Sequence, residues 1–113
     1  MNSNPQAVPL VCNMNEFTLV ERVKHIQTAT QLFQTVQHIQ DAERGYEFIF
    51  PGETTTLIKV AEFIAKEKLC CPFLEFTLKM IPNYETTSLL LTGPEGTQEF
   101  LREEFSEAFN LSK

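Results

Sequence analysis

The stretch "ETTTLIKVAEFIAKEKLCC", residues 53–71, contains the clearest helical pattern in the chain. Its apolar residues recur at spacings of three and four, which predicts a buried stripe of Leu57, Val60, Ala61 and Ile64. We expect Thr54 or a neighbour to cap the start. Pro72 ends the helix, because proline disfavours helical geometry in the residue before it.

After the proline the hydrophobic period changes from about 3.6 to two, which is typical of a half-buried strand. In "FLEFTLKM", residues 73–80, the residues predicted to face inward are Leu74, Phe76, Leu78 and Met80. "PNYE" then forms a turn, and "TSLLLT" at 87–92 returns as a second strand. "GPEG" leads into a last helix at 97–110, with a predicted stripe of Leu101, Phe105 and Ala108.

The first half of the chain shows a similar order of patterns. Thr18 and Glu21 have the spacing of a capping box at the start of a helix over 18–33. Segments 35–40 and 46–51 form a hairpin, and Gly45 supplies a turn residue able to take a positive φ. The predicted apolar stripe of this helix is Leu19, Val20, Val23 and Ile26, which leaves His25 on the surface.

The elements therefore follow the order helix, hairpin, helix, hairpin, helix. This order predicts an α+β, two-layer domain, with an antiparallel sheet of about four strands and helices on one face. Residues 1–14 are expected to be an extended lead-in, and residues 15–113 a single domain. Ten phenylalanines and no tryptophan indicate a core filled by phenylalanine rings. The strand order stays open, because two hairpins can join in more than one way.

Composition bounds the class of function. The 113 residues carry 15 acidic and 9 basic side chains, for a formal charge of −6, without a cluster of Lys and Arg. Nucleic-acid binders usually present a basic patch, so a nucleic-acid partner is not expected. There is no apolar run of about 18 residues and no signal-peptide pattern, so we expect no membrane partner. Three cysteines, an odd number, argue against a secreted disulfide framework and predict a cytoplasmic protein with reduced thiols.

Three segments together, "GYEFIFP", "EKLCCPFLEF" and "LTGPEGTQEFL", resemble a family of small bacterial proteins of uncharacterised function. Those proteins show a Glu-x-x-Cys-Cys-Pro-Phe motif, an alternating strand and a Thr-Gly-Pro-Glu-Gly turn into a helix. The resemblance covers roughly residues 12–105. It implies no reaction, but it marks a cluster of Glu67, Cys70, Cys71, Pro72 and Phe73, with Cys12 at a further position where a cysteine is expected.

The cysteines are the candidate metal ligands. Thiolates suit soft or borderline ions such as zinc or copper(I), and Glu67 lies three residues before Cys70 on the same helical face. Cys70 and Cys71 diverge by about 100° on a regular helix, so they share an ion only if the helix has unwound at Pro72. Cys12 adds a third sulfur if the N-terminal segment crosses this helix end. His25 and His38 are further candidates without supporting spacing.

Two other roles compete with metal binding. A nucleophilic thiol is disfavoured, because the negative end of the helix dipole opposes a thiolate at the C-terminus. Structural packing is a strong alternative, since free cysteine is among the most buried residue types.

The sequence supports three hypotheses of function. The leading one is a soft-metal or thiol-sensing protein that uses Cys70, Cys71, Cys12 and Glu67. The second is a non-catalytic interaction or dimerisation module whose cysteines only pack. The third is a small-molecule-binding domain with an apolar cavity near Phe73 and Tyr46. None of them requires an enzyme.

Overall fold

The computed structural model describes residues 13–82 and 85–111 of the chain. Within these ranges the fold is α+β, as predicted, with four α-helices and a four-stranded antiparallel sheet. The elements are η1 (Met14–Glu16), α1 (Leu19–Phe33), β1 (His38–Ala42), β2 (Gly45–Pro51), α2 (Thr54–Cys70), β3 (Glu75–Ile81), β4 (Thr86–Thr92), α3 (Thr97–Glu104) and α4 (Ser106–Leu111). The expected lead-in, residues 1–14, lies mostly outside the described residues.

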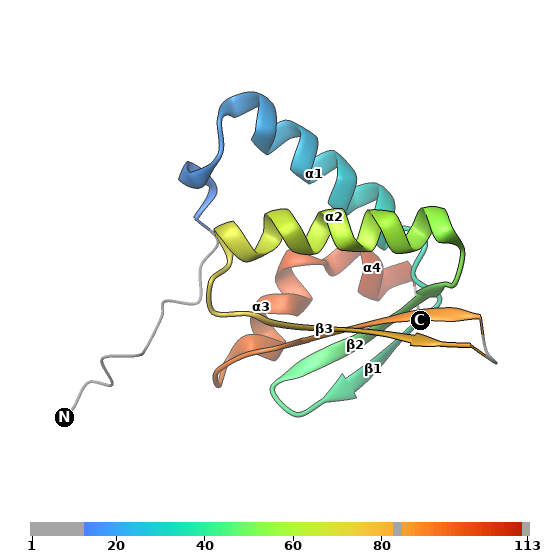
Figure 1. The fold of residues 1–113 in the computed structure, drawn as a ribbon. Coiled ribbons are helices and arrows are strands. Elements are labelled where there is room, and N and C mark those ends of the chain that lie inside the picture. The colour runs from blue at the N-terminus through green and yellow to red at the C-terminus, as the bar shows by residue number, and fades with distance from the viewer. Residues whose placement is uncertain (1–12, 83–84, 112–113) are drawn as a thin grey trace.

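The sheet joins the two predicted hairpins through their second strands. Its order is β1-β2-β4-β3, and every neighbouring pair is antiparallel. The helices lie on one side of this sheet (Figure 1). β1 and β3 are therefore the edge strands, and no described strand pairs with their outer edges.

Phenylalanine rings fill the space between sheet and helices. Phe33, at the end of α1, stacks on Phe105 with ring centroids 4.3 Å apart. The same ring makes edge contacts at 5.1–5.4 Å with Phe48, Phe50 and Phe63. All five are buried, which confirms the predicted aromatic core. Such pairs stabilise the fold beyond the burial of apolar area.

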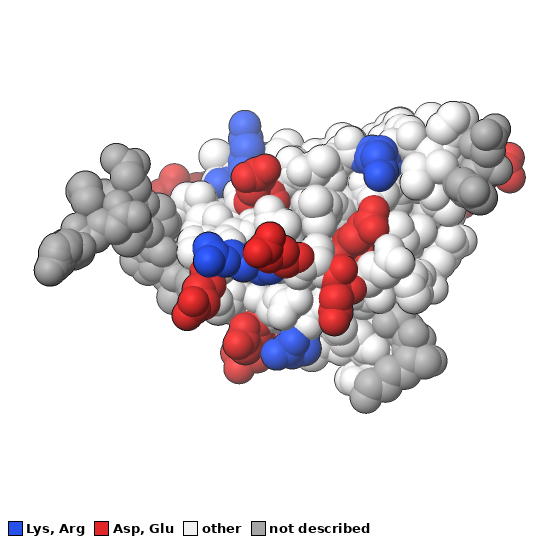
Figure 2. Space-filling model, turned by 90° about the horizontal axis from the view of Figure 1, so that it is seen from below, with Lys and Arg blue, Asp and Glu red and all other residues white. Residues whose placement is uncertain are grey.

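The opposite face of the sheet carries charged and polar side chains together with the partly buried Ile49 and Leu90. Strand register places Glu47, Glu75 and Lys79 on the side away from the buried Phe48 and Leu89. Figure 2 views this face, and it shows acidic and basic side chains interspersed, without a patch of one sign. Alternation of buried and wet residues along a strand is typical of an antiparallel sheet covered on one face.

The predicted start of α1 is confirmed, but its predicted buried face is wrong. Thr18 and Glu21 form both hydrogen bonds of the capping box. The buried residues of α1 are His25, Leu32 and Phe33, whereas the predicted stripe is 50–77% exposed: Leu19, Val20, Val23 and Ile26. The aromatic cluster around Phe33 sets the rotation of the helix, and this rotation turns His25 inward.

α2 is rotated in the same sense relative to the prediction. Its buried residues follow a regular spacing of four and three: Thr56, Val60, Phe63, Glu67 and Cys70. Of the predicted stripe, Val60 is buried, Leu57 and Ile64 are partly buried, and Ala61 is exposed. The N-cap residue is Glu53, the neighbour of Thr54, and it makes no side-chain cap bond.

The C-terminal half departs from the prediction at two places. The last helix breaks at Phe105, whose φ of −117° and ψ of 36° let its ring enter the aromatic cluster. Leu78 and Met80 lie on the inner face, opposite Leu89 and Thr87. They are nevertheless 39% and 45% exposed, because β3 is an edge strand. The predicted turn includes residues 83–84, which lie outside the described residues.

Gly45 is needed for a different reason than the predicted one. The residue with positive φ in the first hairpin turn is Arg44, at 58°. Gly45 lies in β2, where a Cβ atom would stand 1.9 Å from the carbonyl oxygen of Leu91. Close approach of β4, not turn conformation, therefore requires glycine here.

Among the described residues, no helix has the length and apolar composition needed to cross a membrane.

The rotation of α1 makes a stability prediction. Phe33→Ala removes a ring at the centre of the core and should lower the free energy of unfolding by about 3–5 kcal/mol. Val20→Ala, on the face that was expected to be buried, should change it by less than about 0.5 kcal/mol. Urea unfolding followed by circular dichroism measures both values. A cost for Val20→Ala as large as that for Phe33→Ala would contradict this orientation.

Candidate functional site

Glu67 is a buried carboxylate in the last turn of α2, with only 3% of its surface exposed. Cys70 and Cys71 follow at spacings of three and four, the spacings that bring helical side chains together. Cys71 caps the helix with φ −123° and ψ 72°, so the helix has unwound before Pro72. Unwinding brings the two sulfurs to 3.8 Å, despite their adjacency in sequence.

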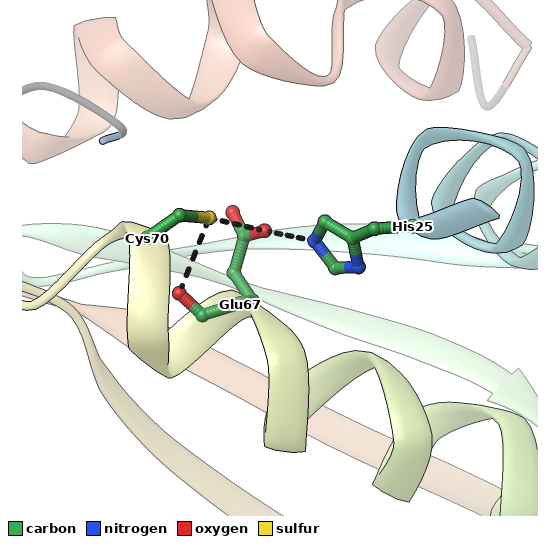
Figure 3. A group of neighbouring side chains, drawn as sticks. All are labelled: His25, Glu67 and Cys70. Atoms are coloured by element: carbon green, nitrogen blue, oxygen red, sulfur yellow. Dashed lines mark hydrogen bonds and ion pairs between the residues drawn. The ribbon is translucent and has the colours of Figure 1, made fainter. Parts of the chain in front are cut away.

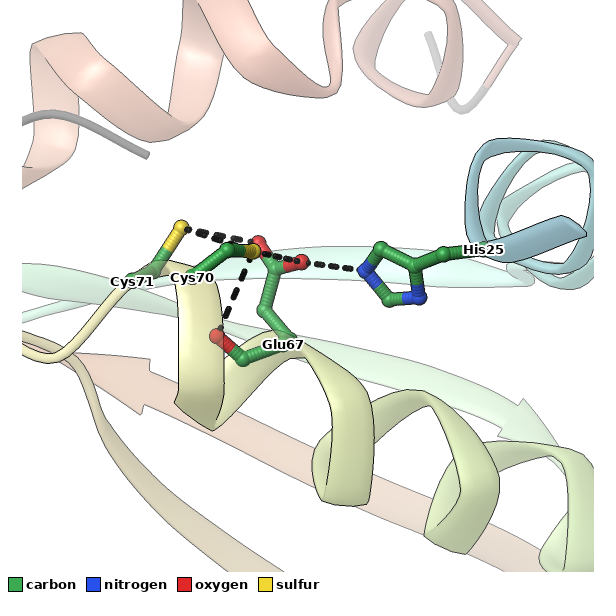
Figure 4. A network of polar contacts seen from close by, with 4 residues as sticks. All are labelled: His25, Glu67, Cys70 and Cys71. Atoms are coloured by element: carbon green, nitrogen blue, oxygen red, sulfur yellow. Dashed lines mark hydrogen bonds and ion pairs between the residues drawn. The ribbon is translucent and has the colours of Figure 1, made fainter. Parts of the chain in front are cut away.

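Both sulfurs lie against the Glu67 carboxylate (Figure 4). Cys70 Sγ is 3.5 Å from Oε1 and 3.5 Å from the backbone carbonyl oxygen of Glu67. Cys71 Sγ is 3.2 Å from Oε2. The predicted grouping of Glu67, Cys70 and Cys71 is therefore present in the folded chain.

The two sulfurs differ in covalent state. Cys70 is a free, buried thiol, whereas Cys71 is disulfide-bonded. The expectation of reduced thiols is therefore wrong for Cys71. The separation of 3.8 Å also excludes a bond between these two neighbours. Cys12, the third sulfur of the predicted site, lies outside the described residues.

The start of the described chain lies at the same helix end. The backbone N–H of Asn13 donates a hydrogen bond to the carbonyl oxygen of Cys70, at 2.5 Å. Asn13 therefore lies at the end of α2, beside Cys70.

His25 is buried in this site, so its predicted surface position is wrong. It is 6% exposed, and its Nε2 lies 2.8 Å from Glu67 Oε1 (Figure 3). Phe17 meets the imidazole edge-on and Phe63 stacks on it, with centroids 5.5 and 5.8 Å away. The sequence does contain a signal for this position. His25 lies four and seven residues before Ala29 and Leu32, a spacing that places all three on one helical face. His38, the other candidate, is exposed on β1.

The second nitrogen of His25 has no partner among the described residues. Nδ1 is buried and makes no hydrogen bond there. Figure 3 shows it on the side of the ring away from Glu67. A buried nitrogen without a partner is uncommon, and such groups occur at functional sites.

Two cavities meet at His25. One of about 160 Å³ has His25, Glu67 and Glu104 at its polar end and Phe33 and Phe105 on its apolar wall. The other, of about 340 Å³, lies between α1 and α2 and is also lined by Glu21, Lys24, Glu62 and Lys66. The buried imidazole is therefore adjacent to open space on both sides of α1.

Burial and nearby negative charge shift two ionisable groups. Burial, together with the charge of Glu67 and the hydrogen bond to it, raises the pKa of the Cys70 thiol to about 12. Partial burial of its carboxyl group, followed by the charge of Glu67, raises the pKa of Glu104, and His25 partly offsets this shift. Cys70 is thus a neutral thiol at pH 7, which argues against a nucleophile or a reactive sensor.

The donor set of the site suits a metal ion. One atom each from His25, Glu67 and Cys70 lie within 4.8 Å of one another, and all three residues are buried. Zinc holds nitrogen, oxygen and sulfur ligands at about 2.0–2.3 Å, which sets tetrahedral ligand atoms about 3.3–3.8 Å apart. The separation of 3.5 Å between Cys70 Sγ and Glu67 Oε1 meets this range. The distance of 2.8 Å between His25 Nε2 and Glu67 Oε1 must lengthen when an ion binds, because a hydrogen bond joins these two atoms in this structure.

Comparisons with protein-family models, with curated proteins and with solved structures find no match for this chain. The resemblance to a family of small bacterial proteins stays a prediction, and the site has to be interpreted from its own chemistry.

The raised pKa of Cys70 predicts a pH dependence of stability. The folded protein retains this proton up to about pH 12, whereas the unfolded thiol loses it near pH 9.0. The contribution of Cys70 is therefore complete below pH 9.0 and is lost as pH rises towards 12. Urea unfolding at several alkaline pH values should show a steeper loss of stability in the wild type than in Cys70→Ala. Equal slopes for the two proteins would contradict the shifted thiol.

Proposed function

We propose that this protein binds a soft or borderline metal ion, with zinc as the first choice, through His25, Glu67 and Cys70. The observation that carries the proposal is the convergence of an imidazole nitrogen, a carboxylate oxygen and a thiol sulfur inside the core. These three donor types are the ones that zinc takes in proteins. Bound zinc would supply a positive charge that neutralises the buried carboxylate and favours the thiolate of Cys70.

Stability alone offers no reason for this cluster. Burying a carboxylate is costly, and well-packed apolar residues of similar volume often replace a buried ion pair without loss. Glu67 occupies a core position of α2 between Phe63 and Cys70, where an apolar side chain would pack. A bound cation would offset this burial cost, because it pairs with the negative charge of the Glu67 carboxylate.

The state of Cys71 bears on which ion is preferred. While Cys71 is disulfide-bonded, the described donors are one nitrogen, one carboxylate and one thiol, which favours zinc over copper(I). Reduction would free a second sulfur 3.8 Å from Cys70 Sγ, within the range of tetrahedral zinc ligands. We therefore expect tighter binding under reducing conditions, and a larger share of copper(I) binding.

The surroundings of His25 limit the affinity for zinc that we expect. Histidine ligands usually donate their second N–H to a carboxylate or carbonyl, which orients the ring. His25 Nδ1 has no such partner among the described residues. We expect binding weaker than at a four-thiolate structural site.

The remaining hypotheses keep some support. An interaction module fits the exposed apolar side chains on α1 and β3. A small-molecule site draws support from the second cavity at His25, whose volume of about 340 Å³ lies within the usual 300–1,000 Å³, but this cavity is not the one expected near Phe73 and Tyr46. The rings named for that site lie in separate contacts, Phe73 against Phe100 and Tyr46 against Phe109.

The metal proposal predicts one-to-one zinc binding by the reduced protein in native mass spectrometry and competitive titration. His25→Gln, Glu67→Gln and Cys70→Ser should each weaken it by more than about 100-fold. Loss of a ligand costs more than loss of a residue that only hydrogen-bonds to a ligand, which lowers metal affinity by about 10–100-fold.

Two variants serve as matched controls. His38→Gln removes the other, exposed histidine, and Glu62→Gln removes an exposed charge from the same helix as Glu67. Both should bind zinc as the wild type does. Zinc binding that survives all three ligand substitutions would overturn the proposal. A wild type that binds no zinc would also overturn it.

A further inference from the structure

β3 is an edge strand whose inner face is neither charged nor fully covered. Phe76, Leu78 and Met80 point toward the helix side, and the last two are among the most exposed apolar residues of the sheet. Edge strands usually carry features that prevent pairing with another chain, such as short length or an inward charge. β3 runs for seven residues and has no inward charge.

The other edge of the sheet differs in both respects. β1 has five residues, and Asp41 lies on its inner face, opposite Tyr46. Burying this carboxylate in a new interface would be costly. The edge available for strand pairing is therefore that of β3.

The sequence of β3 is complementary to itself. "EFTLK", residues 75–79, has an acidic end, a basic end and Thr77 at its centre. When two copies pair antiparallel about Thr77, Glu75 of each copy stands opposite Lys79 of the other. Phe76 then stands opposite Leu78 on the inner face. Opposite charges and apolar pairs directly across strands are both stabilising.

We propose that two copies of this chain associate through antiparallel pairing of their β3 strands, in the register centred on Thr77. A two-fold axis perpendicular to the sheet joins the two four-stranded sheets into one and keeps the helices of both copies on the same side. The interface covers Leu78 with Phe76 of the second copy. It also pairs the charge of Lys79 with Glu75 of the second copy. An unpaired lysine on an edge strand would oppose pairing with another strand.

Charge reversal tests this register by sedimentation velocity over a concentration series. The wild type should form dimers. Glu75→Lys and Lys79→Glu should each raise the dimer dissociation constant by about tenfold or more, since two opposite-charge pairs become like-charge pairs. The double variant should recover the dimer, and an equimolar mixture of the two single variants should form a heterodimer. Lys59→Glu, which makes the same charge change on exposed α2 surface, should stay dimeric.

Three results would overturn the proposal. The first is a wild type that stays monomeric over the whole series. The second is a dimer that persists in both single variants. If that dimer is lost in Val23→Glu, the two copies meet at the exposed face of α1 instead. The third is single variants that are monomeric alone and do not associate when mixed.

Discussion

A negative charge buried at the end of α2 is the constraint around which this fold is arranged. Glu67 lies inside the aromatic core with almost no exposure, and a carboxylate in that position requires compensation. Compensation comes from far along the chain, because the imidazole that meets it belongs to α1, 42 residues earlier. The contact ties the first helix to the second.

The same carboxylate organises its other surroundings. Cys70 and Cys71 turn their sulfurs toward it from the unwound helix end, and Asn13 bonds to that end from the N-terminal side. Glu104, on α3, lines the same small cavity as Glu67, and its burial together with the charge of Glu67 raises its pKa. Helices from the start, middle and end of the chain therefore meet at one polar point in an otherwise apolar core. A cation at that point would stabilise all three contacts together.

The general plan of the fold follows from the sequence, because it depends on local signals. The capping box, the helix stop at Pro72 and the change of period to two are decided within a few residues. The helix rotations were not predictable by counting apolar residues. The buried face of α1 includes His25 and that of α2 includes Thr56 and Glu67, while Leu19 and Val23 face outward. Where polar residues occupy core positions for their chemistry, a hydrophobic stripe indicates the wrong face.

The candidate site was predictable only in the part that is local in sequence. Glu67, Cys70 and Cys71 lie within one helical turn, so their spacing was sufficient to group them. His25 comes from another helix, and only the packing of Phe33 against Phe63 and Phe105 brings it to the carboxylate. The order of strands escaped prediction for the same reason, because β2 and β4 pair over a long sequence separation.

The most direct test of this account is the X-ray absorption spectrum of the reduced protein loaded with one equivalent of zinc. Sulfur scattering together with the multiple-scattering features of an imidazole is the expected result, and the imidazole features should disappear in His25→Gln. This outcome would place the ion between α1 and α2, at the Glu67 carboxylate. A first shell of oxygen and nitrogen alone, unchanged in that variant, would mean that the buried cluster does not hold the metal.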